Sequence, residues 1–331
     1  MKGGKLVCLG IESTAHTFGA GIVDEKCNIL ANEKHSYTTE SGGMIPREIA
    51  DHHLQWAESV LKNALQKAGV GIKDIDVFAF AQGPGMGPAL KVGAVATRTL
   101  ALLHNKPLLG VNHPVAHIEI GKKLCGSRDP LVVYASGGNS QIIGYESNCY
   151  RVFGETLDIG IGNLFDSFGR ELGIGFPAGP KIDEMYFLGK TLIELPYTVK
   201  GMDLVFSGLL TVASKKAKSH SKEDLCYSLM HTSIAMLCEV TERALAHTGK
   251  KEVLLTGGVA CSKALQKMFQ EMCDARGVKL FVTPPAVAID NGLMIAWLGL
   301  LMHKSGVKMS VSETRVNQKF RTDHVKVTWK V

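Results

Sequence analysis

The chain has 331 residues, 45% of them hydrophobic, and it contains 36 glycines. This size predicts one large or two medium globular lobes, each with a substantial core. The formal net charge of +6 permits an anionic partner without requiring one. No stretch approaches the roughly eighteen uncharged apolar residues that a membrane span needs, which excludes a membrane-spanning protein. Eight scattered cysteines without a C-x-x-C pair, in a chain without a signal peptide, predict reduced thiols in a cytoplasmic protein.

The first half of the chain alternates between strand and helix patterns. Short polar turns at 12–17 and 24–26 separate three strand-like runs, and a loop rich in glycine and proline at 82–87 precedes a helix. The expected elements, in chain order, are strands at 5–11, at 19–23 and from about residue 27, a helix from about 46, a strand at 75–81, a helix from about 88, a strand at 107–111 and a helix from about 113.

The second half opens with the same pattern. The expected elements are strands at 131–135, at 140–145 and through about 153, helices at 161–172, 179–188, 207–219 and 222–248, a strand at 252–256, a helix at 261–276, a short strand near 280 and a helix at 290–303. Both halves therefore begin with strand, turn, strand, turn and strand before their helices. This repeat predicts a duplicated α/β fold in which polar turns face each other across a cleft.

A nucleotide phosphate chain held between two such hairpins is the arrangement of the actin, sugar-kinase and heat-shock ATPase superfamily. We therefore expect a two-lobed fold with mixed sheets flanked by helices. The expected division is an N-terminal lobe at 1–130 and a C-terminal lobe at 131–300. The tail at 301–331 is expected to pack back on the N-terminal lobe.

Two histidines four residues apart, His113 and His117, lie in the helix that begins near residue 113. Residues at i and i+4 share one face of a helix, and Pro114 suits an early helical position. The spacing lets both imidazoles reach one metal ion, although polar helices also contain such pairs without any metal. The segment lacks the Glu of H-E-x-x-H, so it has no built-in general base for peptide hydrolysis.

Glycines follow two of the expected buried strands. The backbone N–H groups of the turn at 136–140 could close on phosphate or carboxylate oxygens, and an ordinary hairpin turn fits the same residues. Gly257 and Gly258 end a strand and open a helix, which suits packing against a purine or ribose. Their alternative role is a tight connection that needs a positive φ.

Two further segments could bear on nucleotide binding. The loop at 83–87 resembles a phosphate loop, but it lacks Gly-Lys-Ser/Thr and is therefore not a Walker A motif. We interpret it as a structural turn that supports the cleft. Asp183 is expected on the first turn of a helix, where it could complement the helix dipole or accept hydrogen bonds from ribose hydroxyls.

Seven segments in order resemble one family, the tRNA threonylcarbamoyladenosine transferases called TsaD in bacteria. The archaeal and eukaryotic form of this family is the catalytic subunit of the KEOPS complex, and the tail at 318–323 and 327–329 is similar to the archaeal branch. The resemblance covers nearly the whole chain. The segments that carry it are Gly-Ile-Glu-Ser-Thr-Ala-His-Thr (10–17), Asn-His-Pro-Val-Ala-His-Ile-Glu (112–119), Tyr-Ala-Ser-Gly-Gly-Asn-Ser-Gln (134–141), Gly-Glu-Thr-Leu-Asp-Ile-Gly-Ile-Gly-Asn (154–163), Phe-Ser-Gly-Leu (206–209), Thr-Gly-Gly-Val-Ala (256–260) and Asp-Asn-Gly-Leu-Met-Ile-Ala (290–296).

The resemblance implies a specific reaction. The family transfers a threonylcarbamoyl group from threonylcarbamoyl-adenylate to the exocyclic amine of the adenosine 3′ of the anticodon in ANN-decoding tRNAs. A separate enzyme makes the adenylate from threonine, bicarbonate and ATP. The nucleotide ligand is accordingly ATP, AMP or threonylcarbamoyl-adenylate.

The resemblance also implies a set of site residues. One divalent metal, with iron favoured over zinc, would be held by His113, His117 and Asp290, and Tyr134 would be a weaker ligand. Such a metal can orient the anhydride and stabilise the negative charge that develops on its carbonyl oxygen and on AMP. The implied substrate contacts are Tyr134, Ala135, Ser136, Gly137, Gly138, Asp166, Gly179, Asp183 and Ser262.

This chain departs from the usual family pattern at three places. It has Asp183 where Glu is usual, Cys261-Ser262 where Asn is usual, and Ala178-Gly179-Pro180 where Gly-Gly-Pro is usual. These changes affect the recognition of ribose and adenine. The group that removes the amine proton is open, and Glu12 and Asp166 are the candidates, each of which could equally be a structural hydrogen-bond acceptor.

The resemblance implies tRNA and other KEOPS subunits as partners, and no membrane. A small dimerising subunit should dock on the helices of the N-terminal lobe, a small atypical kinase on the other lobe, and a kinase-activating subunit completes the complex. The basic tail from Arg315 to Lys330 either helps to hold tRNA or packs back on the N-terminal lobe, and we favour the second.

Three other functions compete with the transferase. A kinase-like or chaperone-like ATPase of the same fold would want Asp at the first hairpin to organise magnesium, where this chain has Glu12. A metalloprotease, the activity behind the older label O-sialoglycoprotein endopeptidase, would need the missing catalytic Glu. A scaffold or nucleic-acid-binding subunit without chemistry would not need the ligand set at His113, His117 and Asp290.

Overall fold

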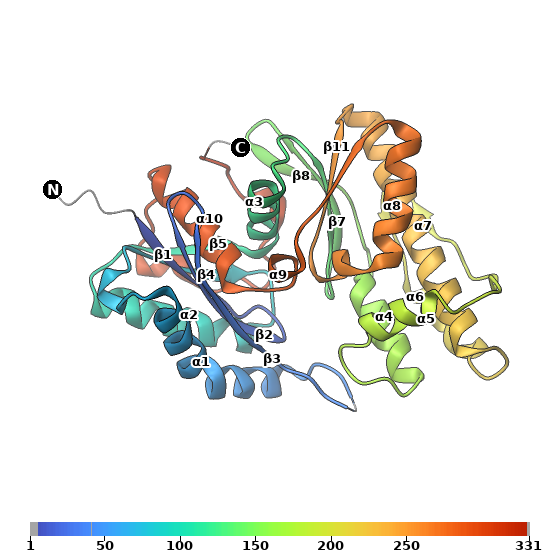
Figure 1. Cartoon of the computed structure of the whole chain (residues 1–331), viewed down its shortest axis with the longest axis horizontal. Helices are drawn as coiled ribbons and strands as arrows, with labels where there is room; N and C mark the ends of the chain where they lie inside the picture. Colours follow the sequence, from blue (N-terminus) through green and yellow to red (C-terminus); the bar gives the residue numbers. More distant parts are fainter. Residues whose placement is uncertain (1–5, 41, 330–331) are drawn as a thin grey trace.

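Two five-stranded sheets with the same strand order form the framework of the computed structural model (Figure 1). The first has the order β3-β2-β1-β4-β5, and the second has the order β12-β11-β6-β7-β8, which is the same arrangement read from the other edge. In each sheet the three strands that come first along the chain pair antiparallel with one another. The two later strands pair in parallel with each other, and one of them also pairs in parallel with the first strand. The predicted duplicated α/β fold is therefore confirmed.

The structure describes residues 6–40 and 42–329, so Lys5 of the first expected strand and Lys330 of the basic tail lie outside the described residues. The strands of the first sheet are β1 (Val7–Glu12), β2 (Thr17–Asp24), β3 (Ile29–Ser36), β4 (Val77–Gly83) and β5 (Leu108–Asn112). Those of the second are β6 (Leu131–Ala135), β7 (Ser140–Glu146), β8 (Cys149–Glu155), β11 (Glu252–Thr256) and β12 (Lys279–Val282).

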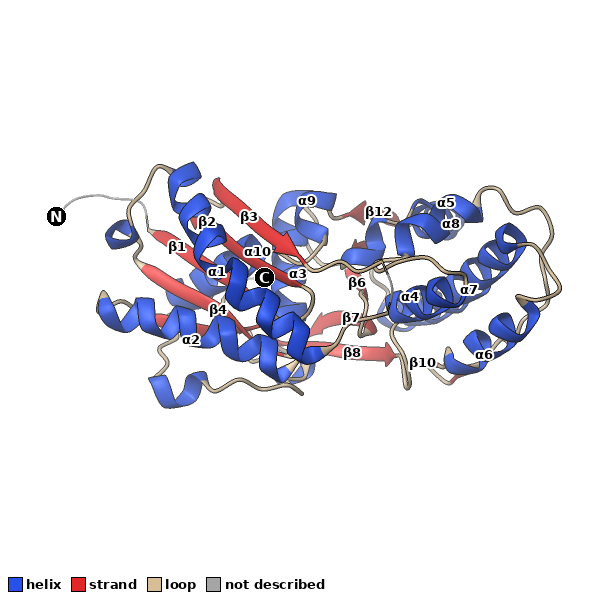
Figure 2. Ribbon diagram, turned by 90° about the horizontal axis from the view of Figure 1, so that it is seen from below, coloured by secondary structure: helices blue, strands red, loops and turns tan. Residues whose placement is uncertain are grey.

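Ten α-helices lie in the described part of the chain. They are α1 (Pro46–Ala68), α2 (Gly87–Leu103), α3 (His113–Cys125), α4 (Ile161–Glu171), α5 (Gly179–Tyr186), α6 (Ser207–Lys216), α7 (Lys222–Thr248), α8 (Lys263–Arg276), α9 (Pro285–Ala288) and α10 (Gly292–Lys304). Helices α1 and α2 cover one face of the first sheet, and α3 and α10 lie on its other face (Figure 1). Figure 2 shows α4 to α8 gathered at the end of the second lobe, beyond the second sheet.

The helices α3 and α10 belong to a core that both sheets share. Alternate residues of β1 divide between the two faces, since Leu9 packs under α1 and α2 whereas Cys8 joins the shared core. That core also takes Val132 and Leu254 from the second sheet. The region between the sheets is therefore a packed junction, and the N-terminus of α3 lies within it.

Helix α10 packs directly on the backbone of the first sheet because glycines allow a close approach. A Cβ at Gly21 would lie 2.0 Å from the nitrogen of Leu293, and one at Gly10 would lie 2.1 Å from the nitrogen of Ala296. We had expected this last long helix to belong to the C-terminal lobe at 131–300. In the structure, α10 instead packs on the first sheet. The boundaries of the two lobes remain a prediction.

The tail follows α10 across the molecule with two short 3₁₀ turns, at Val311–Thr314 and Thr322–His324. The side-chain amide of Gln82 donates to the carbonyls of Glu313 and Arg315, each at 2.8 Å. The indole N–H of Trp329 donates to Glu119 Oε1 at 2.7 Å, in the shared core. The tail therefore makes specific contacts with the C-terminal end of β4 and with α3.

Local details differ from the expected elements. The third strand starts at Ile29, because Cys27 adopts a left-handed φ of 67° in the preceding turn. The helix expected from 261 is divided into a 3₁₀ turn, Gly258–Cys261, and α8, with Ser262 between them as the N-cap. The short strands β9 (Val199–Lys200) and β10 (Asp203–Leu204), and the helix α9, were not expected. Over residues 6–40 and 42–329, the structure contains no helix with the length and apolar character of a membrane span.

Candidate active site

The two histidines lie at the start of α3, immediately after β5. Asn112 is the N-cap of this helix, and its side chain accepts the N–H of Val115 at 3.1 Å. Pro114 occupies the first turn, as predicted. The side chains of His113 and His117 consequently lie one turn apart, and both are buried.

Asp290 approaches these histidines from the loop before α10. Asn291 caps α10, because its side chain accepts the N–H of Met294 at 3.0 Å. Its amide donates to the carbonyls of Val287 at 3.0 Å and Ile289 at 2.8 Å, which fixes the loop. The close packing of α10 on the first sheet then holds Asp290 against α3.

Three ligand atoms of these residues form a nearly equilateral triangle. His117 Nε2 lies 3.2 Å from His113 Nε2 and 3.3 Å from Asp290 Oδ1, and the third side measures 3.4 Å. Atoms held about 2.1 Å from one tetrahedral metal are about 3.4 Å apart. The spacing and the two imidazoles with one carboxylate therefore fit a divalent transition metal.

Glu12 lies behind His113 and fixes its orientation. Its Oε2 accepts the Nδ1–H of His113 at 2.8 Å, which turns Nε2 of that ring toward the centre. Its Oε1 accepts both the N–H and the hydroxyl of Thr14 at 2.6 Å. Glu12 is fully buried and is engaged by two residues, so its contacts fix the ring of His113.

The charges of the centre stabilise one another without a metal. Burial alone would lower the pKa of His113, but the carboxylates of Glu12 and Asp290 raise this pKa well above its ordinary value. Burial would raise the pKa of Asp290, but the two histidines hold it well below the usual range. Burial keeps the pKa of His117 low. A metal ion would therefore displace a proton from His113.

Tyr134, at the end of β6, packs beside this centre. Its ring centroid lies 5.4 Å from that of His117 and 6.4 Å from that of His113. Burial raises the pKa of its hydroxyl, which hydrogen-bonds to Ser136. The structure thus brings Tyr134 to the centre, and its coordination of a metal stays a prediction.

The turn that follows Ala135, the last residue of β6, lies next to Tyr134. The N–H and hydroxyl of Ser136 both donate to the carbonyl of Asn139 at 3.0 Å. The N–H of Asn163, at the start of α4, donates to the carbonyl of Gly137 at 3.0 Å. A Cβ on Gly138 would meet no atom within 4 Å, so the backbone of this residue faces open space.

The two glycines after β11 have different environments. Gly257 has a φ of 92°, and a Cβ there would lie 2.4 Å from the carbonyl oxygen of Ala135. It therefore makes the tight connection that we gave as one alternative. A Cβ on Gly258 would meet nothing within 4 Å, as would one on Gly179 at the start of α5. These open positions leave room for a ligand beside the backbone.

Asp183 and Ser262 meet each other at the N-terminus of α8. The hydroxyl of Ser262 donates to Asp183 Oδ1 at 2.6 Å and accepts the N–H of Leu265 at 3.1 Å. The same carboxylate accepts the N–H groups of Lys263 at 3.0 Å and Ala264 at 3.1 Å. Asp183 lies in α5, yet it stabilises the N-terminus of α8 rather than that of its own helix, which was one of the two roles given for it. Asp183 and Ser262, at two of the three places where this chain departs from the usual family pattern, are therefore hydrogen-bonded to each other.

Asp166 lies on α4, apart from Glu12. Its Oδ1 accepts the N–H of Ala178 at 2.8 Å, and burial raises its pKa. The structure thus places the expected site residues in four groups. They are the three candidate metal ligands with Tyr134, the turn after β6, Asp166 with the start of α5, and Asp183 with Ser262 at the N-terminus of α8. Thr14 was missed, although its position two residues after Glu12 in a polar turn is a signal that the sequence contains.

Comparisons with known proteins agree with this geometry. The family profile for TsaD, tRNA N6-adenosine threonylcarbamoyltransferase, matches residues 28–297. A protein of that name from Thermococcus sibiricus is 55% identical, over 98% of this chain and 100% of its own length. This chain belongs to the TsaD family. Its members are tRNA-modifying transferases that form threonylcarbamoyladenosine, so tRNA is the macromolecular substrate.

Solved structures with little sequence identity share the fold of this family member. HypF from T. kodakarensis has a TM-score of 0.63 at 14% identity, over 91% of this chain and 48% of its own. A ROK family glucokinase from Streptomyces griseus has a TM-score of 0.50 at 13% identity, over 89% of this chain and 99% of its own. These likenesses confirm the expected fold and say nothing further about the reaction.

Proposed function

We propose that this protein transfers the threonylcarbamoyl group of threonylcarbamoyl-adenylate to the exocyclic amine of the adenosine 3′ of the anticodon in ANN-decoding tRNAs. The observation that carries this proposal is the triangle of His113, His117 and Asp290 beside the turn after β6. These three residues would hold one divalent metal, iron in preference to zinc, with Tyr134 as a fourth ligand. When bound, the metal would supply Lewis-acid stabilisation of negative charge.

The transfer needs little covalent chemistry from the protein. The amine nitrogen forms a bond to the carbamoyl carbon, the bond from that carbon to a phosphate oxygen breaks, and AMP leaves with the electron pair. The backbone N–H groups of Gly137 and Gly138 can hold the phosphate or carboxylate oxygens without adding a competing nucleophile. Glu12 keeps the ring of His113 in place, and we therefore do not propose it as the base.

The donor nucleotide is proposed to lie across the second lobe. Its adenine and ribose would pack against Gly257 and Gly258, near Asp183, and its phosphates would point to the turn at 136–140. The open space at Gly138, Gly179 and Gly258 supports this placement. Asp183 and Ser262 already bond each other, so a ribose hydroxyl would use the remaining lone pairs of these oxygens.

Two exposed apolar areas support the proposed protein partners. On α1 and α2 the side chains of Leu54, Leu102 and Leu103 are exposed, and this surface suits the small dimerising subunit. On and after α5, Phe187, Leu188, Leu192 and Tyr197 are exposed, and this surface suits the small atypical kinase. The kinase-activating subunit would then join through the kinase. Eight free cysteines support a reducing cytoplasmic location.

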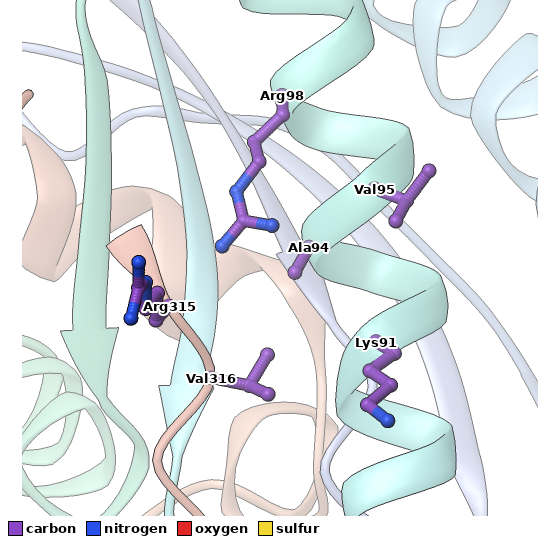
Figure 3. Close-up of a pocket in the computed structure, with 6 residues that line it drawn as sticks. All are labelled: Lys91, Ala94, Val95, Arg98, Arg315 and Val316. Carbon is purple, nitrogen blue, oxygen red and sulfur yellow. The ribbon is translucent and has the colours of Figure 1, made fainter. Parts of the chain in front are cut away.

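A basic groove between α2 and the tail supports direct contact with tRNA. It has a volume of about 480 Å³ and is lined by Lys91, Arg98 and Arg315 together with Ala94, Val95 and Val316. Figure 3 shows Arg98 extending from α2 toward the segment that carries Arg315 and Val316. Arg98 is held by Thr314, whose hydroxyl accepts its Nε–H at 3.0 Å and whose carbonyl accepts a second N–H. These cations suit phosphates of a tRNA backbone.

The direct test incubates the protein with threonylcarbamoyl-adenylate, the partner subunits and unmodified tRNA, followed by mass analysis of the nucleosides. We expect threonylcarbamoyladenosine at one position of ANN-decoding tRNAs only. Modification at several adenosines, or in tRNAs that decode other codons, would contradict the proposed substrate. The absence of any modified nucleoside with every component present would contradict the reaction.

A further inference from the structure

The segment that carries Asp290 crosses from the second sheet to the first. It leaves the second sheet after β12, where the N–H of Thr283 donates to the carbonyl of Leu255 at 3.0 Å, and it runs through α9 to α10. We call residues 283–290 the crossing segment. Asp290 directly precedes the N-cap of α10, so the groups that hold the end of this segment also hold the carboxylate at the metal centre.

The strand β3, at the edge of the first sheet, holds the crossing segment with two side chains. The side-chain amide of Asn32 donates to the carbonyl of Ala286 at 3.1 Å. The ammonium of Lys34 donates to the carbonyl of Asp290 at 3.4 Å. Figure 2 shows β3 beside α9, which belongs to the crossing segment. The strand therefore contacts this segment in its middle and at its end.

Asn32 and Lys34 point to the same face of the sheet because they are two residues apart. Their partners on β2 are Gly21 and Gly19, over which the first turn of α10 packs. A Cβ at Gly19 would lie 2.9 Å from the nitrogen of Gly292. The glycines thus admit the start of the helix, and the side chains beside them hold the segment that leads into it.

Glu33, between these two residues, points to the opposite face. Its Oε1 accepts the ammonium of Lys67, on α1, at 2.7 Å. Lys34 and Lys67 are both exposed lysines that bond an oxygen at β3 or beside it, but only Lys34 is on the face where α10 packs. Lys67 is therefore a matched control for Lys34.

We propose that Lys34 is a positioning residue for the metal centre, supported by Asn32. The two side chains fix the crossing segment so that Asp290 presents its Oδ1 to the two histidines of α3. This inference rests on the proposed function, which assigns a metal to these three ligands. Groups that orient a metal ligand from behind matter nearly as much as the ligand, and their loss commonly lowers metal affinity about 10–100-fold.

The contact of Lys34 is with a backbone carbonyl, so it leaves the carboxylate of Asp290 free for a metal. Lys34 is exposed, and water and salt therefore weaken the repulsion between its ammonium and a bound cation. The effect of Lys34 on the centre is consequently geometric, through the direction of the Asp290 peptide. It acts through Asp290 and does not itself touch the metal.

This arrangement ties all three metal ligands to the first sheet. His113 and His117 follow β5, and Asp290 is held by β3. The proposed donor site lies instead on the turns after β6 and β11 of the second sheet. A displaced Asp290 should therefore impair the transfer step more than the binding of the donor.

The test compares Lys34→Met with Lys67→Met in the metal-free full-length chain. Methionine keeps a long side chain but has no N–H to donate. Titration with Co²⁺ measures the metal affinity, and the d–d absorption bands of the bound ion report its coordination geometry. We expect Lys34→Met to bind Co²⁺ about tenfold more weakly and with shifted bands, whereas Lys67→Met should match the wild type.

Two further variants separate positioning from charge. Lys34→Arg keeps a donor on a long side chain and should restore the Co²⁺ affinity and the bands. Asn32→Ala removes no charge, yet it should shift the bands and weaken Co²⁺ binding, though less than Lys34→Met, because its contact is further from Asp290. Co²⁺ affinity and bands of Lys34→Met that equal those of the wild type would overturn the proposal.

Kinetics of the metal-loaded protein with its partner subunits and tRNA give a second readout. We expect Lys34→Met to lower kcat about tenfold and to leave the KM for the adenylate within about twofold of the wild type. A raised KM with unchanged Co²⁺ affinity would assign Lys34 to the donor and overturn the proposal. A wild type that binds no Co²⁺ would overturn the metal centre together with this inference. If the wild type binds Co²⁺ but makes no modified nucleoside, the proposed function fails, while the Co²⁺ comparison still decides the role of Lys34.

Discussion

The candidate metal centre keeps its charges close to balance through a few buried residues. Two imidazoles face the carboxylate of Asp290, and a second carboxylate, Glu12, accepts the far N–H of His113. Thr14 satisfies the remaining oxygen of Glu12 with two short hydrogen bonds. A divalent cation and a proton therefore compete for the same pair of negative charges.

This competition predicts a pH dependence for metal binding. The pKa of His113 is raised, so this ring holds a proton up to a pH well above its ordinary range. A metal must displace that proton, and its affinity should fall about tenfold for each unit that the pH drops below the raised pKa. Metal titrations of the metal-free protein at several pH values would measure the slope. An affinity that does not change with pH would contradict this charge arrangement.

The isosteric variant Glu12→Gln gives the matched control. The amide oxygen can still accept the Nδ1–H of His113, but the negative charge is gone. We expect metal affinity about 10–100-fold lower, with the pH dependence moved to lower pH because His113 is no longer held protonated by this carboxylate. The same behaviour in Glu12→Gln and the wild type would show that Glu12 does not act on His113.

The two adjacent glycines after β11 predict opposite effects for similar substitutions. A side chain at Gly258 meets no atom within 4 Å, so Gly258→Val should fold, keep its metal and lose binding of the adenylate. A side chain at Gly257 meets the carbonyl of Ala135 at 2.4 Å and needs a φ of 92°. Gly257→Ala should therefore destabilise the fold. Calorimetry of Gly258→Val that gave wild-type affinity would place the nucleotide elsewhere.

The sequence could indicate part of this site but not its assembly. The spacing of His113 and His117 predicted their shared face, because helix geometry is local. Asp290 is 173 positions from His117, and only the resemblance to a family linked them. Its placement depends on a helix that packs on glycines of another strand, and no local pattern encodes such a contact.

At the level of elements, the N-terminus of α8 shows how one helix stabilises the start of another. Ser262 supplies the N-cap, and Asp183 from α5 accepts two further N–H groups of the first turn. These bonds join α5 and α8 at the point where the proposed ribose site begins.

Removal of this cap should affect stability in a graded way. Ser262→Ala loses the N-cap and one partner of Asp183, and we expect a loss of about 1 kcal/mol in the free energy of unfolding. Asp183→Ala loses three hydrogen bonds, one of them from the hydroxyl of Ser262, and should cost more than Ser262→Ala. Urea unfolding of both variants measures the difference. An Asp183→Ala protein as stable as the wild type would show that these bonds contribute nothing.

The regular elements were predictable because each has a clear period or a buried run. Strands of five to eight residues and helices such as α7 have enough positions to reveal a pattern. The strands β9 and β10 have two residues each, and α9 has four, which is too few for any period to show. Their positions depend on tertiary contacts instead.

At the level of the whole molecule, the two sheets are joined by a common core rather than by a flexible linker. The tail completes this core with Val325, Val327 and Trp329, which are 5–9% exposed. Its upstream part lines the basic groove with Arg315. One segment can therefore have both of the roles that the sequence left open.

Deletion of residues 315–331 should consequently prevent stable folding, since it uncovers part of the shared core. A truncated protein that stays folded and only binds tRNA more weakly would show that the tail is a binding arm and not a structural element. Thermal unfolding and tRNA binding of the truncated chain distinguish the two results.

A smaller change isolates the basic groove. Lys91→Ala/Arg315→Ala removes two exposed cations and leaves the buried part of the tail intact. We expect weaker tRNA binding for every sequence, with the slope of log affinity against log salt reduced by about one for each lost cation. An unchanged slope would place the tRNA on another surface.

The link between the metal and the transfer is tested by counting metal and modified nucleoside in the same samples. The wild type and the His113→Ala/His117→Ala variant would each be combined with the adenylate, partner subunits and unmodified tRNA. We expect one metal ion per chain and threonylcarbamoyladenosine for the wild type, and neither for a folded double variant. A double variant that keeps stoichiometric metal, or that still modifies tRNA at the wild-type rate, would contradict this expectation.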